Sequence, residues 1–193
     1  MKRHLLSLLL CASLAPFAVQ AQALKAGTFD PPRAAPEIAL PASTGKPFTL
    51  SSLRGKVVVL EFGYTSCPYV CPVSLASLAQ ARTLLGAAAA EVQVLFVTVD
   101  PERDTTAHLR DYLGKFDKSF IGVSGSPAQI QAVLKDYGIS VTRQAMEKQG
   151  EYQLGHSSYL YFVDRRGMLR ALMPFGRPAA DIAHDLAILL KQK

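Results

Sequence analysis

The chain has 193 residues and a formal net charge of +6, and 49% of its residues are hydrophobic. This length gives one domain with room for a proper hydrophobic core. The basic residues are spread along the chain and form no Lys/Arg block with interleaved aromatic residues. Nucleic acid is therefore excluded as an expected partner.

Residues 1–21 resemble a secretory signal peptide, with a basic start followed by the apolar run 5–14 and small residues. Cleavage after Ala21 leaves 172 residues with a formal charge of +4. The run is short for a membrane span, which needs about 20 residues. We therefore expect a periplasmic protein, soluble or anchored at the membrane by an uncleaved N-terminus. A lipoprotein attached at Cys11 is disfavoured, because Leu10 occupies a position that usually takes a small residue.

The mature chain divides into an Ala/Pro-rich segment, 22–41, and a folded domain, 42–193. The first segment is expected to be an extended lead-in that does not pack. Residues 45–50 suggest a turn and a short strand, and therefore an N-terminal β-hairpin. The apolar run 56–62 predicts a buried central strand.

Further elements follow from apolar periodicity, helix caps and turn residues. Residues 140–155 are expected to form a polar hairpin or an inserted loop. The predicted helices are 72–85, 104–116, 127–137 and 178–190, and the predicted strands are 92–99, 120–123, 158–163 and 168–173. This order predicts an α/β protein with a mixed central sheet flanked by helices, which is the thioredoxin-like arrangement.

Cys67 and Cys71 lie between the strand 56–62 and the helix that follows it. A disulfide between them would close a very short loop and stabilise little, so reactivity explains the pair better than stapling. Proline follows each cysteine, and Pro72 suits the first position of a helix, with Cys71 just outside it. Near a helix N-terminus, thiol pKa values fall and thiolates become available for disulfide exchange or for metal binding.

The spacing of the two cysteines distinguishes these uses. Residues four apart on a helix have Cβ atoms about 5–6 Å apart, whereas a relaxed disulfide needs about 3.5–4.5 Å. A metal ion between two sulfurs tolerates the wider span, because metal–sulfur bonds are about 2.3 Å long in zinc sites. A disulfide requires some distortion of the loop, so metal binding is favoured while redox chemistry stays open.

His156 is the best candidate for a third ligand. It precedes the strand 158–163, at the place where thioredoxins usually have a proline beside the cysteine loop. His108 is expected to be solvated or to act as a cap, and His184 to lie on the surface. Zinc prefers four ligands, and Met146 is a poor fourth, whereas two thiolates and an imidazole suit copper.

Several motifs together resemble the SCO/SenC family of copper-binding assembly factors of cytochrome c oxidase, over about residues 27–190. The matching segments are 29–33 (FDPPR), 45–50 (GKPFTL), 62–68 (FGYTSCP) with 71–72 (CP), 99–105 (VDPERDT) and 155–157 (GHS). The resemblance implies a thioredoxin-like protein that binds copper, as Cu(I) or Cu(II), through Cys67, Cys71 and His156. Tyr69 departs from the Asp that many relatives have there.

The family resemblance implies copper delivery to the dinuclear copper centre of oxidase subunit II, or to another copper-accepting client. A metal-independent thiol–disulfide reductase is the alternative, with Cys67 attacking, Cys71 resolving and an external thiol–disulfide reductant completing the cycle. The enzyme assignment therefore stays open. A peroxiredoxin-like peroxidase fits poorly, because the proline that normally begins its motif is missing. Asp100 and Glu102 either contact the site or a partner, or belong to a plain loop before a helix capped at Asp104.

Overall fold

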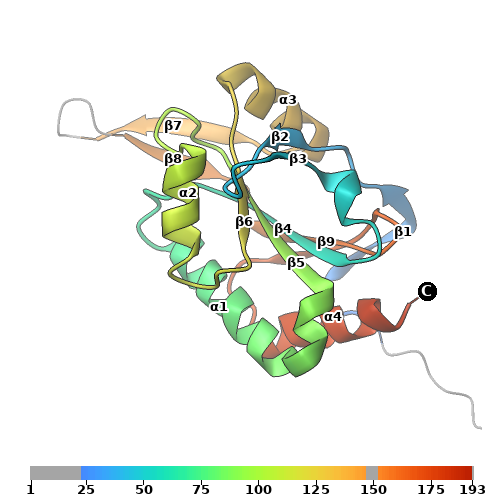
Figure 1. Cartoon of the computed structure of the whole chain (residues 1–193). Helices are drawn as coiled ribbons and strands as arrows, with labels where there is room; N and C mark the ends of the chain where they lie inside the picture. Colours follow the sequence, from blue (N-terminus) through green and yellow to red (C-terminus); the bar gives the residue numbers. More distant parts are fainter. Residues whose placement is uncertain (1–22, 147–151, 193) are drawn as a thin grey trace, which may run out of the picture.

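The computed structural model describes residues 23–146 and 152–192, and its core is one mixed sheet covered by helices on both faces (Figure 1). In sheet order, the six strands are β1 (Gly27–Ala34), β10 (Met168–Pro174), β9 (Tyr159–Val163), β4 (Val57–Gly63), β5 (Val92–Thr98) and β6 (Ile121–Val123). Strands β4, β5 and β6 run parallel, whereas β9 is antiparallel to β4 and β10 to β9. This confirms the mixed, thioredoxin-like sheet expected from the sequence.

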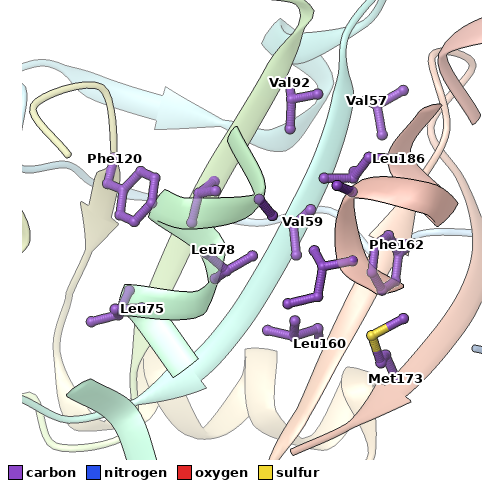
Figure 2. Close-up of a cluster of buried hydrophobic side chains, with 14 of the residues drawn as sticks. Val57, Val59, Leu75, Leu78, Val92, Phe120, Leu160, Phe162, Met173 and Leu186 are labelled. Atoms are coloured by element: carbon purple, nitrogen blue, oxygen red, sulfur yellow. The ribbon is translucent and has the colours of Figure 1, made fainter. Parts of the chain in front are cut away.

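Two hydrophobic clusters lie on opposite faces of the sheet. The α-helices of the described chain are α1 (Val70–Leu85), α2 (Thr106–Leu113), α3 (Pro127–Tyr137) and α4 (Ala179–Lys191). Helices α1, α2 and α4 bury apolar side chains in the first cluster, where Leu78 and Leu186 lie near Val59 (Figure 2). Helix α3 packs in the second cluster, together with the N-terminal hairpin. The sheet is therefore shielded from water on both faces, as its parallel strands require.

All seven residues of β4 are buried, and so are all seven of β5. Alternate side chains of a strand point to opposite faces. Val57 and Val59 therefore join the cluster under α1, and Val58 and Leu60 join the other one. The same alternation directs Glu61 toward α1, so the strand carries one acidic side chain into an otherwise apolar layer.

The expectation that residues 22–41 do not pack is wrong. Strand β1 pairs antiparallel with β10, and β2 (Ala39–Pro41) pairs with β3 (Pro47–Thr49) in the expected N-terminal hairpin. Ile38 is fully buried. Prolines are tolerated in β1 because it is an edge strand whose register with β10 is irregular between Thr28 and Arg33.

Helix α1 begins earlier than predicted. Its first residue is Val70, so Cys71 lies inside the first turn, and Pro72 is the third helical residue. Proline is accepted there because first-turn amides have no intrahelical acceptor. Helix α3 has its predicted bounds, with Ser126 capping its start and left-handed Gly138 at its end.

Helix α2 is shorter than the predicted 104–116 and is capped by Thr105, whose hydroxyl accepts from the His108 amide. Short 3₁₀ segments cover Leu50–Leu53 and Gly86–Glu91.

The insertion around 140–155 forms a two-stranded ribbon of β7 (Val141–Ala145) and β8 (Tyr152–His156). In the described ranges, no helix has the length and apolarity to cross a membrane. The predicted signal, 1–21, lies outside these residues.

Candidate metal and thiol site

The two cysteines meet at the junction between β4 and α1. The connecting residues 64–69 are called the cysteine loop. Cys67 lies in this loop and is half-buried, while Cys71 is buried in the first turn of α1. The Cys71 amide donates a hydrogen bond to the Cys67 sulfur over 3.5 Å, and both thiols are free. The loop therefore brings the two sulfurs together at a helix N-terminus, as expected from the sequence.

The pair has an unequal acidity. The pKa of Cys67 is lowered to about 5, mainly because the Cys71 thiol donates to it, and the amides of Cys71, Tyr69 and Val70 add to this effect against the cost of burial. The pKa of Cys71 is raised well above its usual range by that same donation, by burial and by the nearby Glu61 charge. At neutral pH the site therefore presents one thiolate, on Cys67, and one protonated thiol.

This acidity predicts the pH dependence of alkylation. In reduced, metal-free protein, the rate of Cys67 modification by iodoacetamide is expected to rise through a midpoint near pH 5, because only the thiolate reacts. The Cys71→Ala variant removes the main cause of the lowered pKa, so its midpoint should rise by at least about one pH unit. A wild-type midpoint of about 8.5, the value of an unperturbed thiol, would contradict this electrostatic account.

Two residues of β4, Gly63 and Glu61, lie next to Cys71. A Cβ atom at Gly63 would lie 2.7 Å from the Cys71 sulfur and 2.9 Å from the Phe96 ring, so only glycine leaves room for the thiol. The Glu61 side chain is buried, and its Oε2 has no hydrogen-bond partner among the described residues. Burial raises its pKa to about 8, against a lowering contribution from the Ser74 hydroxyl. The sequence reasoning missed Glu61, although an acid within the apolar run 56–62 was a usable signal.

His156 ends β8 and borders the same small cavity as Cys71 and Glu61, which has a volume of about 10 Å³. Its Nδ1 lies 3.3 Å from the Leu154 carbonyl oxygen, and its ring lies edge-on to Tyr64 at 5.8 Å between centroids. Cys67 does not line this cavity. Among the described residues, no group of three His, Cys, Asp or Glu side chains is arranged to hold a metal ion. The structure thus brings imidazole and thiol to one cavity without gathering all three donors.

The remaining histidines differ from the sequence expectation in part. His108 is not merely solvated, because its Nε2 lies 3.0 Å from the Thr65 hydroxyl in the cysteine loop. His184 is half-buried, with Nδ1 2.9 Å from Asp185. Met146 is exposed, and so is Tyr69, whose ring lies edge-on to Phe175.

Asp104 is fully buried and fixes the base of the cysteine loop. Its carboxylate accepts from the Thr65 amide at 3.0 Å, the Thr65 hydroxyl at 2.6 Å and the Thr98 hydroxyl at 2.7 Å. It therefore does not cap α2, which corrects one reading of the sequence. Asp100 is also buried and accepts from the Tyr152 hydroxyl on the His156 strand. The acidic segment after β5 thus contacts both halves of the candidate site.

Comparisons with known proteins bear on the family and the fold of the chain. The sequence pattern of the SCO1/SenC family matches residues 28–191. The chain belongs to the SCO1/SenC family. A Stutzerimonas stutzeri protein whose name describes it as copper-binding is 35% identical over 178 residues, which cover 88% of this chain and 85% of that protein. The match to the SCO2-like protein of Rickettsia felis covers 60% of that relative's length.

Two solved SCO structures have the same fold. The copper-bound ScoI of Bradyrhizobium japonicum is 35% identical with a TM-score of 0.75, and the match covers 81% of this chain and 99% of that one. Copper-bound yeast Sco1 is 27% identical with a TM-score of 0.74, covering 84% and 91%. These neighbours place this SCO1/SenC chain in a copper-binding family with a thioredoxin-like fold.

Proposed function

We propose that this protein is an exported copper metallochaperone that holds one copper ion through Cys67, Cys71 and His156. The observation that carries the proposal is the Cys67 thiolate beside Cys71 at the start of α1, next to the cavity that His156 borders. Two relatives with the same fold have copper bound. The export part of the proposal rests on the sequence of residues 1–21 and places the protein in the periplasm.

The donor chemistry fits copper. Thiolates are soft ligands that select Cu(I), and a neutral imidazole accepts copper in either oxidation state. Cys71 keeps its proton in the free protein, so copper binding must release that proton. His156 lies at the end of a two-stranded ribbon, and in this proposal its side chain moves toward the sulfurs to complete the ligand set. Because Cys67 is half-exposed, an incoming client ligand can join the ion before a resident ligand leaves.

The proposed client is a protein that accepts copper at thiolate-rich sites. Family membership points to the dinuclear copper centre of cytochrome c oxidase subunit II, because SCO proteins are linked to the assembly of that enzyme. Copper is the cargo in this proposal, so the site should bind it firmly and also exchange it.

The test is copper titration of reduced protein. The wild type is expected to take up one Cu(I) per chain, and His156→Ala should lose copper to a competing chelator at least about 10-fold more readily, because one of three ligands is missing. His184→Ala is the matched control, since His184 lies on α4, away from the cysteine loop. Absorption and EPR spectra of the Cu(II) form should change in His156→Ala only.

Equal copper retention in wild type and His156→Ala would refute the ligand assignment. A wild type that takes up no copper at micromolar concentration would refute the metallochaperone. Unchanged circular dichroism spectra show that the variants keep the fold, so a loss of copper can be assigned to the missing ligand.

A second candidate function, thiol–disulfide reduction, is favoured by the unequal acidity of the cysteines. The Cys67 thiolate attacks one sulfur of a client disulfide, forming a mixed disulfide and releasing the client's other sulfur as a thiolate. Cys71 then gives up its proton and attacks Cys67, which forms the Cys67–Cys71 disulfide and frees the second client thiol. The client gains two electrons and the protein loses two, which an external dithiol reductant restores.

This second function has a distinct signature. Reduction of a model disulfide should be abolished in Cys67→Ser and insensitive to His156→Ala and to copper chelators. If His156→Ala slowed the reaction as strongly as Cys67→Ser, a metal-independent mechanism would be wrong.

A further inference from the structure

The ribbon that carries His156 is not part of the central sheet. Strands β7 and β8 pair only with each other in the described structure. Figure 1 shows the ribbon projecting beyond the main sheet near α2 and α3. His156 is joined to the central sheet through residues 157–158, which lead into β9, and the rest of β8 is positioned by side-chain contacts between the ribbon and the body of the domain.

Tyr152, at the start of β8, makes the densest of these contacts. Its hydroxyl donates to Asp100 Oδ1 over 2.7 Å, and its carbonyl oxygen accepts from Arg103 Nη1 at 3.2 Å. Its ring is stacked against two guanidinium groups, with Arg103 Cζ 3.8 Å and Arg143 Cζ 3.6 Å from the ring centroid. Arg103 also pairs with Asp100, so the tyrosine is held by polar contacts and by cation–π contacts together.

The partner of Tyr152 is a buried carboxylate. Asp100 follows β5 directly and is 3% exposed, and its amide donates to the Thr98 hydroxyl. The same short turn continues to Asp104, which holds Thr65 in the cysteine loop. Residues 100–104 therefore bind the His156 ribbon at one end and the cysteine loop at the other. A contact at either end affects the separation between the imidazole and the sulfurs.

A second set of contacts between the ribbon and the body of the domain lies closer to His156. The Leu154 amide donates to the Tyr64 hydroxyl over 3.2 Å, and the Tyr64 ring contacts the His156 ring edge-on. These two contacts hold the C-terminal end of β8 against Tyr64. Tyr152 fixes the other end, four residues before His156, so the strand is held at two points.

We propose that Tyr152 is a positioning residue for the metal site: its hydroxyl, bonded to Asp100, holds β8 so that His156 faces the cysteine cavity. The inference rests on the proposed function, because it treats His156 as a ligand. Tyr152 does not touch the sulfurs or the ion. Its effect is to pre-organise the histidine, so that little order is lost when copper binds.

The first test needs no metal. Tyr152→Phe keeps the ring between the two guanidinium groups and removes only the hydroxyl. Amide hydrogen exchange at residues 153–156 of reduced, metal-free protein is expected to rise about 10-fold, because local opening of the ribbon becomes easier. Exchange in β4 should stay the same. Tyr159→Phe is the matched control, since this neighbouring tyrosine is 44% exposed and starts β9.

The second test measures Cu(I) transfer to a competing chelator. Tyr152→Phe should release copper about 3- to 10-fold faster than wild type, as expected for loss of one supporting hydrogen bond around a ligand. Tyr152→Phe combined with His156→Ala should release copper at the rate of His156→Ala alone, because a positioning residue has no effect once its ligand is gone. A purely structural role would instead give additive losses in the double variant.

Unchanged exchange in Tyr152→Phe, or an additive double variant, would overturn the positioning role. Faster exchange with unchanged copper release would also overturn it, provided that His156→Ala does release copper faster. If wild type and His156→Ala behave alike, the proposed function fails at its ligand assignment, and the exchange experiment still decides whether Tyr152 holds the ribbon.

Discussion

Replacing Asp104 by alanine is expected to lower the free energy of unfolding by about 3–5 kcal/mol, because three hydrogen bonds to a buried carboxylate are lost together. The donors left without an acceptor are the Thr65 amide, the Thr65 hydroxyl and the Thr98 hydroxyl. Two of them belong to the segment that leads to Cys67. The measurement is urea unfolding of reduced, metal-free protein at pH 7.

Asp111→Ala is the matched control for this prediction. Asp111 is on α2, its side chain is 73% exposed, and its ion pair with Arg110 is at the surface. Its loss should change the unfolding free energy by no more than about 0.5 kcal/mol. If Asp104→Ala cost as little as Asp111→Ala, the carboxylate would not be the anchor of the cysteine loop. Copper binding by any folded fraction of Asp104→Ala should also be weaker, because the loop loses its fixed end.

Replacing Glu61 by glutamine is expected to stabilise the metal-free protein at neutral and mildly alkaline pH. In the folded state Glu61 keeps its proton up to about pH 8, whereas in the unfolded chain it releases the proton near 4.5. The unfolded state therefore binds fewer protons between these values, and stability falls as the pH rises from about 4.5 to 8. Glutamine does not titrate, so the variant lacks this loss and should be more stable at pH 8 by roughly 2–4 kcal/mol.

The measurement is the unfolding free energy of wild type and Glu61→Gln at several pH values from 4 to 8. The two proteins should have similar stability near pH 4 and should diverge as the pH rises. Glu91→Gln serves as the control, because the Glu91 side chain is 55% exposed and its ion pair with Arg165 contributes little. A constant difference across this range would show that the pKa of Glu61 is not raised in the folded protein.

The buried Glu61 carboxyl, which lowers the stability of the folded protein as the pH rises, lies next to the Cys71 thiol. When Glu61 ionises, above about pH 8, its charge adds to the two larger causes of the raised pKa of Cys71, which are the hydrogen bond to Cys67 and burial. Glu61→Gln should therefore leave the unequal acidity of the two cysteines unchanged at neutral pH. The cost in stability and this added contribution to the Cys71 pKa have one physical source, which is a carboxyl group placed in an apolar layer.

The elements predicted correctly are those with strong local signals. Residues 56–62 and 92–99 are dense apolar runs, and 127–137 has a capping serine, a proline at the start and a glycine at the end. The strand from Gly27 to Ala34 was missed because it contains two prolines and pairs with β10, about 140 residues away in the chain. The local sequence gives no signal for that pairing, and the propensity of proline argues against it.

The candidate site, like the fold, has one part that the local sequence predicts and another part that it does not. The position of Cys67 and Cys71 between a strand and a helix is local, so their spacing and flanking residues were enough to predict a reactive thiol pair at a helix start. The family assignment, also made from motifs, is confirmed by the match over residues 28–191. The role of His156 as a ligand stays a prediction, because the described side chains do not bring three donors together.

The sequence by itself therefore determined the fold class, the family and the two sulfurs, because each depends on local patterns and their order along the chain, which are visible without knowing which distant segments meet. Tertiary structure alone decided which groups surround those sulfurs. Asp104 reaches Thr65 across 39 positions in the chain, and Tyr152 reaches Asp100 across 52. Glu61 becomes a much weaker acid because the folded chain buries it. Burial and long-range hydrogen bonds set acidity and position, and neither is encoded in the local pattern.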